Sequence, residues 1–302
     1  MIRIATRASA LARWQAERVG ALLGESGERG ERGVEYVLVS TTGDRDQTSD
    51  LHAIGGQGVF TKEVQQAVLD GAADVAVHSA KDLPTATPPG LQLATVPERA
   101  DPRDALVGSS FEGLVSGARI GTGSVRRRAQ LAAARPDLTF GPLRGNIQTR
   151  LRKREELGYD AIVVAFAALE RLGLVDDADV LDVGVMLPQV AQGALAAECR
   201  ADDARTIMRL RAIDDRIAHV AVDTERAFLA ELGGGCDLPC GALARVGGPD
   251  GAIVLDALLA SLDGHVVLRT RVAGDDPVDV GATAARDLLD GKGGRALMDD
   301  GA

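Results

Sequence analysis

The sequence predicts an α/β protein of two or three domains, and three observations support this. Short aliphatic strands alternate with amphipathic helical segments along most of the chain. Hydrophobic residues make up 45% of the chain but aromatic residues only 3%. The core must therefore be built from Ala, Val, Leu and Ile, as in sheets that are covered by Ala-rich helices. The length of 302 residues also exceeds what one core usually fills.

The first run of elements has the rhythm of a parallel sheet. Ser9 is expected to cap the first helix, and the proline-rich stretch LPTATPPG ends the run. We expect the strands to pair in parallel, because a helix links each strand to the next. The predicted strands are residues 2–6, 34–40 and 74–78, and the predicted helices are residues 9–23 and 59–69.

A second α/β run follows a charged crossing segment at residues 98–103. Its predicted elements are strands at 119–120, 138–140 and 161–165, and helices at 125–134, 147–157 and 167–172. Residues 187–199 are predicted to form a turn and a strand, before helices at 203–212 and 215–232. The last stretch alternates strands (241–246, 253–261, 266–272) with one helix (278–289), which predicts an antiparallel α+β module.

The charges are distributed unevenly along the chain. The net charge of −10 disfavours a nucleic-acid partner. Residues 119–154 nevertheless contain ten Lys and Arg and only one acid, a local net charge of +9. This basic block predicts a localised anion site, and the alternative is a solvated basic helix face.

The cysteines and the apolar segments indicate a cytoplasmic protein. Three cysteines, Cys199, Cys236 and Cys240, do not make a disulfide framework. The N-terminus has no apolar run of signal-peptide length, and no stretch reaches the roughly 18 apolar residues of a membrane span. The four histidines are scattered along the chain, so no metal site is expected.

Three loops between a strand and a helix each supply arginine. In GTGSVRRRAQL, Ser124 can cap a helix whose first turn carries Arg126 and Arg127. A helix N-terminus favours an anion, and cations in its first turn oppose the helix dipole, so a ligand is favoured there. The incomplete glycine pattern disfavours a dinucleotide.

The other two loops repeat this arrangement. In LRGNIQTRL, Arg144 ends a strand, a turn follows, and Arg150 lies further along a helix. In ATRAS, Arg7 and Ser9 follow the first strand. Ligands of open α/β sheets bind at these strand ends. Three such loops therefore predict a small ligand with several negative charges, although Arg150 alone could be a surface ion pair.

The segment HSAKDLP places Lys81 and Asp82 at a further strand end. An acid beside so many cations is expected to stay ionised, which suits it to stabilise a developing cation or to move a proton. The alternative is that Asp82 caps a turn before Pro84. His78 is expected to be a core residue.

The glycine-rich loop GGGCDLPCG carries Cys236. A thiol in a polar turn near arginines is expected to be reactive. The alternatives are an inert thiol or half of a Cys-x-x-x-Cys metal pair, and the second has no further ligands nearby.

A series of segments resembles the porphobilinogen deaminase (hydroxymethylbilane synthase) family. In chain order they are RIATRASALARWQA, IGGQGVFTKE, ADVAVHSAKDLP, ERADPRDALV, GTGSVRRRAQL, RPDL, LRGNIQTRL, YDAIVVAFAALERLGL, LPQVAQGALAAECR, TERAFL and GGGCDLPCG. The resemblance implies an α/β fold with two lobes like those of periplasmic binding proteins, plus a small C-terminal α+β domain. Residues 1–96 and 193–214 would form lobe one, residues 97–192 lobe two, and residues 215–302 the C-terminal domain.

The resemblance also implies an activity. The enzyme would be a transferase of tetrapyrrole biosynthesis, which serves haem, sirohaem and cobalamin-type products. It would join four porphobilinogen molecules head to tail with release of ammonia, and hydrolysis would then give 1-hydroxymethylbilane. The resemblance implies a monomer with porphobilinogen as its small-molecule partner, and a dipyrromethane cofactor bound through a Cys236 thioether.

The family pattern further implies roles for single residues. Asp82 would be catalytic and would handle the pyrrole nitrogens and the cationic intermediate. The residues implied to bind the cofactor or the substrate carboxylates are Arg7, Ser9, Lys81, Thr122, Ser124, Arg126, Arg127, Arg144, Gly145, Asn146, Arg150 and Gln192, with Phe60 as an aromatic contact. Ala53, Gln57 and Gly123 depart from the pattern, with the first two in place of lysines. The rival hypothesis is a non-catalytic two-lobe binding protein for a small anion, which would need neither Cys236 nor Asp82.

Overall fold

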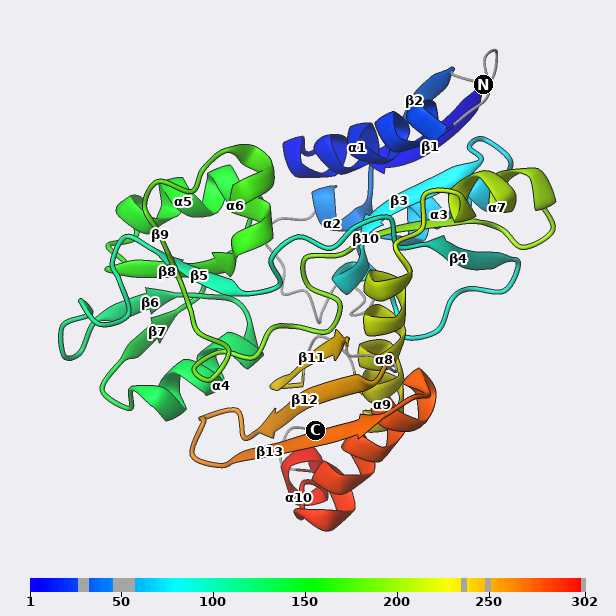
Figure 1. Ribbon diagram of the computed structural model, residues 1–302. Coiled ribbons are helices and arrows are strands. Elements are labelled where there is room, and N and C mark those ends of the chain that lie inside the picture. The colour runs from blue at the N-terminus through cyan, green and yellow to red at the C-terminus, as the bar shows by residue number, and fades with distance from the viewer. Residues whose placement is uncertain (27–32, 46–57, 235–237, 248–250, 300–302) are drawn as a thin grey trace. The chain divides into compact units, whose positions relative to one another are not determined.

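The computed structural model describes residues 1–26, 33–45, 58–234, 238–247 and 251–299 (Figure 1). The chain divides into two compact units. The first contains residues 1–100 and 194–219, and the second contains residues 101–193 and 220–302. The division into three domains with boundaries after residues 96, 192 and 214 stays a prediction.

The first unit contains one five-stranded sheet in the order β2-β1-β3-β10-β4. Strand β1 (Ile2–Arg7) pairs in parallel with β2 (Val34–Val39) and β3 (Val75–Ser79). Strand β10 (Leu195–Arg200) is antiparallel to β3 and to β4 (Leu91–Thr95). The prediction that the three N-terminal strands pair in parallel is therefore confirmed, and the later strand β10 makes the whole sheet mixed. The reason is that β10 returns from the second unit without a helical crossover.

Helices bury both faces of this sheet. On one face, α1 (Ala10–Ser26) and α7 (Ala204–Arg211) pack over Ile2 and Ile4. On the other face, α3 (Lys62–Leu69) packs over Ala5. The inner strand β3 is therefore almost fully buried and largely aliphatic, whereas the edge strand β2 keeps exposed side chains such as Tyr36 and Leu38. The short helix α2 (Thr42–Arg45) and the 3₁₀ turn η1 (Ala80–Asp82) complete the described elements of this unit.

The second unit contains a five-stranded sheet in the order β7-β6-β8-β5-β9. Strand β6 is parallel to β7 and β8, whereas β5 is antiparallel to β8 and β9. Helices α4, α5 and α6 begin and end within one residue of their predicted bounds. The bounds are Asp104–Val107 for β5, Arg119–Gly121 for β6, Thr139–Gly141 for β7, Ala161–Ala165 for β8 and Ala178–Val180 for β9, and Val125–Ala134 for α4, Ile147–Glu156 for α5 and Phe166–Leu172 for α6.

The C-terminal part of the second unit is the predicted antiparallel α+β module. Its strands β11, β12 and β13 form a meander, accompanied by helices α8, α9 and α10. Helix α9 contacts α8 closely, because a Cβ added at Gly281 would lie 2.5 Å from the carbonyl oxygen of Thr224. The bounds are Cys240–Val246 for β11, Ile253–Ala260 for β12, Val267–Gly274 for β13, Arg216–Leu232 for α8, Pro277–Arg286 for α9 and Arg295–Asp299 for α10, with a π-helical turn at Asp287–Gly291.

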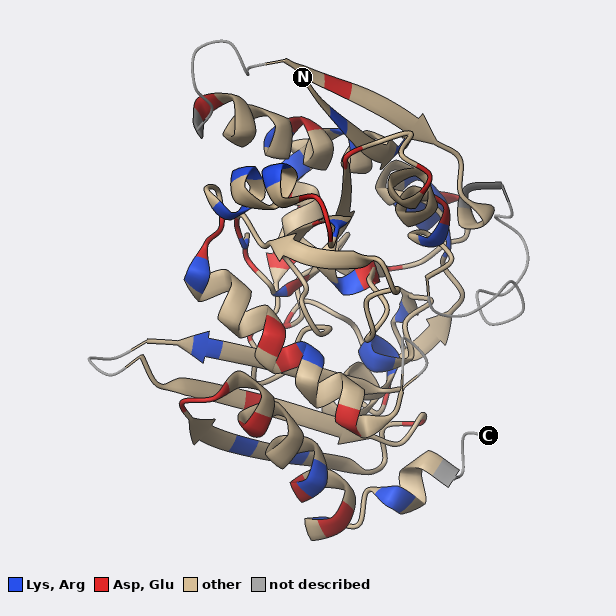
Figure 2. Cartoon of the chain, turned by 90° about the vertical axis from the view of Figure 1, so that its right-hand side faces the viewer, with Lys and Arg blue, Asp and Glu red and all other residues tan. Residues whose placement is uncertain are grey.

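Basic and acidic residues are interspersed along the chain (Figure 2). Local ion pairs compensate the charge of some arginines in the basic block at 119–154. Arg135 lies 2.8 Å from Asp137, and Arg152 lies 3.0 Å from Glu156. Part of the basic block therefore fits the alternative interpretation, a solvated basic helix face.

Within the described ranges, no helix combines the length and apolar character that crossing a membrane requires.

Candidate functional site

Two neighbouring strand ends in the first unit bring predicted site residues together. Strands β1 and β3 are parallel neighbours, so their carboxyl ends meet at one edge of the sheet. At this edge Arg7 is the last residue of β1 and Ser9 follows it, and Lys81 and Asp82 follow β3. The predicted cap is confirmed, because Ser9 Oγ accepts a hydrogen bond of 3.3 Å from the Ala12 amide in the first turn of α1.

Phe60 lies against one of these residues. The guanidinium carbon of Arg7 lies 4.3 Å from the centre of the Phe60 ring. At this distance the ring face attracts the cation and restricts its orientation. Phe60 therefore contacts Arg7, and its contact with a ligand stays a prediction.

Asp82 is the last residue of the 3₁₀ turn η1, and its side chain is half-buried. The turn is closed by the backbone, since the Leu83 amide donates to the Ala80 carbonyl oxygen at 3.3 Å. No hydrogen bond or ion pair joins the Asp82 carboxylate to another described residue. Its side chain therefore does not cap the turn by any described contact, and its carboxylate can act on a ligand.

His78 belongs to the core, as predicted. The residue is 5% exposed, and its Nε2 lies 3.3 Å from Glu198 Oε2. Gln65 Nε2 donates to the same Glu198 oxygen at 2.8 Å. The hydrogen bond between Gln65 and Glu198 links α3 to β10, and the His78 ring of β3 lies beside the same carboxylate.

The loops after β6 and β7 also lie side by side. The Thr122 amide donates to the Gly141 carbonyl oxygen at 2.9 Å, and Thr122 Oγ1 accepts from the Ser124 amide at 3.1 Å. Ser124 Oγ caps α4 by accepting from the Arg127 amide at 3.4 Å. The prediction that Ser124 caps this helix is confirmed.

The loop after β7 is closed by its own side chains. Asn146 Oδ1 caps α5 by accepting from the Thr149 amide at 2.9 Å. Arg150 Nε donates to the Gly145 carbonyl oxygen at 2.7 Å. Gly145 has φ of 120°, a backbone conformation that favours glycine. Arg144 was predicted to end a strand, but β7 ends at Gly141 and Arg144 lies in the loop that follows it.

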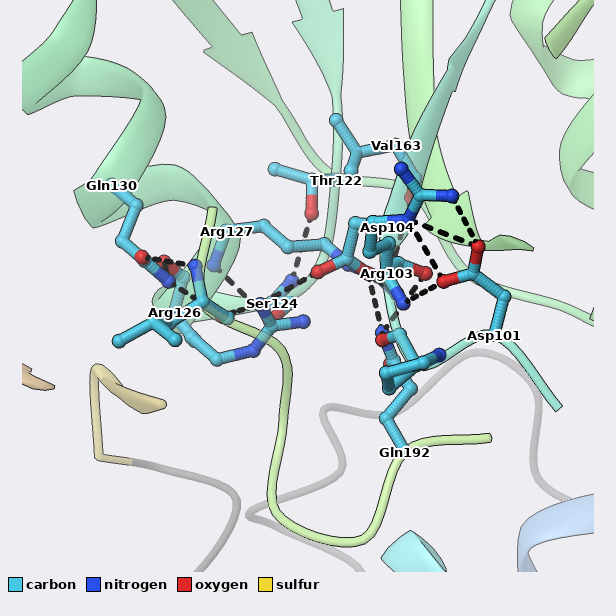
Figure 3. Close-up of polar contacts among 12 residues, drawn as sticks. Asp101, Arg103, Asp104, Thr122, Ser124, Arg126, Arg127, Gln130, Val163 and Gln192 are labelled. Carbon is cyan, nitrogen blue, oxygen red and sulfur yellow. Dashed lines mark hydrogen bonds and ion pairs between the residues drawn. The ribbon is translucent and has the colours of Figure 1, made fainter. Parts of the chain in front are cut away.

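A buried carboxylate, Asp104, joins three predicted site residues (Figure 3). Its Oδ2 accepts from Arg126 Nη1 at 2.7 Å. Its Oδ1 accepts from Arg127 Nε at 3.0 Å and from Arg127 Nη2 at 2.8 Å. Gln192 Nε2 donates to the same oxygen at 2.9 Å. The residues that come together here lie about 20 to 90 positions apart in sequence.

Electrostatics keep this carboxylate ionised. Burial by itself would raise the pKa of Asp104, but the charges of Arg126 and Arg127 and the hydrogen bonds that Asp104 accepts together hold that pKa well below its ordinary value. With two arginines and one carboxylate, the cluster keeps a net charge of +1 in a buried place. A second carboxylate, from a ligand, would neutralise it.

Two nitrogen atoms in this cluster have no hydrogen-bond partner among the residues that the structure describes. Arg126 is 3% exposed, yet its Nε and Nη2 donate to no atom of the described protein. The same holds for Nη1 of Arg144. A buried charged donor without an acceptor is costly, so these atoms indicate an anionic ligand.

Asp104 was not predicted as a site residue. The segment ERADPRDALV mixes acids with arginines, so its charge pattern does not single out the acid that begins the four-residue strand β5. The signal that could have found it is an ionisable residue at the start of a fully buried aliphatic strand. Such an acid needs cationic partners, and Arg126 and Arg127 were the available ones.

The predicted attachment residue, Cys236, lies outside the described residues. The other two cysteines are buried in strands, with Cys199 0% and Cys240 6% exposed. Burial raises the pKa of the Cys199 thiol to about 11, and nearby Asp203 adds to the effect. Neither thiol is suited to react. Among the described residues, no group of His, Cys, Asp and Glu is arranged to hold a metal ion.

Comparison with known proteins gives strong matches over the whole chain. Residues 2–208 match the family model "Porphobilinogen deaminase, dipyromethane cofactor binding domain", and residues 219–290 match "Porphobilinogen deaminase, C-terminal domain". The chain is 46% identical over 301 residues to the porphobilinogen deaminase of Roseiflexus sp. (strain RS-1), covering 98% of this chain and 97% of that one. It is 47% identical over 278 residues to that of Syntrophotalea carbinolica, covering 90% and 86%.

Likeness to solved structures is weaker. A periplasmic binding protein from Brucella ovis with glutathione bound is 16% identical, with a TM-score of 0.42, over 76% of this chain and 68% of that one. A TM-score below 0.5 supports no conclusion about this chain.

Proposed function

Because the chain belongs to the porphobilinogen deaminase family, we propose that Asp82 and the arginines at the strand ends carry out the family's reaction. In this reaction four porphobilinogen molecules are joined head to tail with release of ammonia, and hydrolysis gives 1-hydroxymethylbilane. The enzyme is a transferase of tetrapyrrole biosynthesis. The observation that carries the proposal is the set of buried donors on Arg126 that have no acceptor in the described protein.

The residues present fit the dipyrromethane cofactor of the family. Its two pyrrole rings carry acetate and propionate groups, and the orphaned nitrogen atoms of Arg126 and Arg144 are donors for such carboxylates. When bound, the cofactor supplies the terminal pyrrole to which the first substrate molecule is joined. We assign its attachment to Cys236, and the burial of Cys199 and Cys240 supports this choice.

The strand-end arginines act on the substrate as carboxylate clamps. Porphobilinogen brings one acetate and one propionate, and Arg donates two hydrogen bonds to each planar carboxylate with its fork. Arg7 is oriented by Phe60, and Arg150 by the Gly145 carbonyl oxygen. Orientation before binding reduces the entropy that is lost when the substrate is fixed for reaction.

Asp82 acts on the reacting part of the substrate. Departure of ammonia leaves a positive charge that spreads over the pyrrole ring and its nitrogen. The carboxylate of Asp82 has no described partner, so it is free to accept from the pyrrole N–H and to stabilise this charge. Because the carboxylate lies on a turn that the backbone closes, it needs little rearrangement when the charge develops.

We further propose a cytoplasmic monomer without nucleic-acid or membrane partners. The net charge of −10 supports the first part of this proposal, because a nucleic-acid binder needs a positive surface. Light scattering on the purified chain tests the monomer, since a dimer would double the measured mass.

Turnover separates this function from the rival hypothesis of a non-catalytic anion-binding protein. The purified chain is incubated with porphobilinogen, and released ammonia and tetrapyrrole product are both measured. The expected result is four ammonia molecules per tetrapyrrole. Binding of porphobilinogen without release of ammonia would support the rival hypothesis instead.

A further inference from the structure

The two neighbouring arginines of α4 use their side chains differently. Every guanidinium nitrogen of Arg127 has a protein acceptor, because Nε and Nη2 donate to Asp104 and Nη1 donates to the Val163 carbonyl oxygen at 3.0 Å. Within the described part of the chain, Arg126 donates only through Nη1, to Asp104 and to the Leu187 carbonyl oxygen, both at 2.7 Å. The two side chains are similarly buried, so exposure does not explain the difference.

The unused atoms of Arg126 form one binding edge. Nε and Nη2 of a guanidinium point their N–H bonds in the same direction and can grip both oxygens of one carboxylate. The same edge is used elsewhere in this chain. Arg3 holds Asp74 through Nε at 3.2 Å and Nη2 at 2.6 Å, and Arg135 holds Asp137 through both atoms at 2.8 Å. The edge of Arg126 is buried, and no described carboxylate occupies it.

We infer that Asp104 is the positioning residue of this site, which fixes Arg127 as a structural support and leaves the Nε–Nη2 edge of Arg126 to bind one carboxylate of the cofactor. This inference rests on the proposed function. It assigns different roles to Arg126 and Arg127, although the sequence alone predicts that both lie beside the anion at the N-terminus of α4. Gln192 assists, because it donates to the Asp104 oxygen that also holds Arg127.

The difference has an energetic consequence. In protein without cofactor, replacing Arg126 with an apolar side chain of similar length removes two buried donors that have no described acceptor, which offsets part of the cost of losing its Nη1 hydrogen bonds to Asp104 and to the Leu187 carbonyl oxygen. Arg127 has no unsatisfied nitrogen, so the same replacement removes its hydrogen bonds and leaves Asp104 with less compensation. Loss of Arg127 should therefore destabilise the fold more than loss of Arg126, whereas loss of Arg126 should weaken ligand binding more.

Melting temperature and intact mass of full-length variants test this division. In the Cys236→Ser background, which removes the proposed attachment sulfur, both variants should melt below the parent temperature, and Arg127→Met should melt several degrees below Arg126→Met. With Cys236 present, the fraction of Arg126→Met that carries the added mass should be lower by roughly tenfold to a hundredfold, and turnover should fall in the same proportion. The folded fraction of Arg127→Met should keep the added mass. If Arg127→Met does not fold, the added mass is measured on Arg127→Lys instead.

Asp104→Asn should lower both the melting temperature and the added mass, because it loosens Arg127 and misplaces Arg126. The matched control is Asp74→Asn, which removes another carboxylate that holds an arginine, at the opposite end of its sheet. It should lower the melting temperature and leave the mass unchanged. The inference is overturned if wild type carries the added mass and Arg126→Met and Arg127→Met lose it equally with equal melting temperatures. Wild type without added mass would instead overturn the proposed function.

Discussion

Arg127 Nη2 lies 2.8 Å from Asp104 Oδ1, and neither side chain is more than 6% exposed. A buried ion pair of this kind holds the start of β5 against the first turn of α4. Breaking such a pair by removing one charge is costly, because the other charge stays buried without compensation. The pair therefore links the stability of the second unit to the arrangement of its ligand-binding arginines.

The first prediction concerns the pH dependence of stability. The pKa of Asp104 is lower in the folded chain than its ordinary value, so its stabilising effect is complete above that ordinary value and is lost as the pH falls below it. Asp104→Asn should reduce the free energy of unfolding at neutral pH by about 3–5 kcal/mol. The gap between wild type and variant should shrink below about pH 4. Urea unfolding at several pH values measures this, and a gap that stays constant into acid would contradict it.

The second prediction concerns Asp82. Asp82→Asn keeps the shape of the side chain and removes its charge, so kcat should fall on the order of a hundredfold or more. The melting temperature should stay near wild type, because the carboxylate has no described partner to lose. Asp70→Asn is the control for a surface acid in the same unit and should turn over normally. Full activity of Asp82→Asn would remove Asp82 from the reaction.

The third prediction separates the two tasks of Ser124. Ser124→Asp keeps a side-chain acceptor for the Arg127 amide, so α4 stays capped and the melting temperature is unchanged. The new negative charge repels an anionic ligand, so the KM for porphobilinogen should rise. Ser124→Ala should instead lower the free energy of unfolding by about 1 kcal/mol. If Ser124→Asp binds porphobilinogen as wild type does, no anion binds at this helix N-terminus.

The fourth prediction concerns the contact between the C-terminal module and α4. A Cβ at Gly264 would lie 2.3 Å from the Ala129 carbonyl oxygen, and the φ of Gly264 is 78°. Gly264→Ala should therefore lower stability through both strain and overlap. Gly158→Ala is the matched control, because its φ is 64° but nothing lies within 4 Å of the added carbon. Gly264→Ala should cost about 1–3 kcal/mol more than the control by thermal or urea unfolding. Equal losses would mean that the module does not pack there.

Local patterns explain how much of the fold could be predicted. Helix α4 and strand β8 have the predicted bounds, since helical spacing of apolar residues and a continuous aliphatic run are local signals. Strands β4, β5 and β9 were not predicted, because they are short and lie beside prolines or acids. The antiparallel β10 was expected as a strand, but its pairing depends on residues about a hundred positions away.

In the candidate site, too, local features could be predicted and long-range contacts could not. The loops at the strand ends and the caps Ser124 and Ser9 could be predicted, because capping and anion binding need only neighbouring residues. The role of Asp104 could not be predicted, since its partners approach from other elements of the unit. The difference between Arg126 and Arg127 is also a matter of orientation, which two adjacent identical residues in a sequence cannot reveal.

The intact mass of the purified chain tests the central claim most directly. Wild type should be heavier than its sequence by two linked pyrroles. Cys236→Ser should have lost this added mass, and Cys240→Ser should keep it, because Cys240 is buried in β11. A wild-type chain that has the mass of its sequence and still converts porphobilinogen to hydroxymethylbilane would contradict the claim.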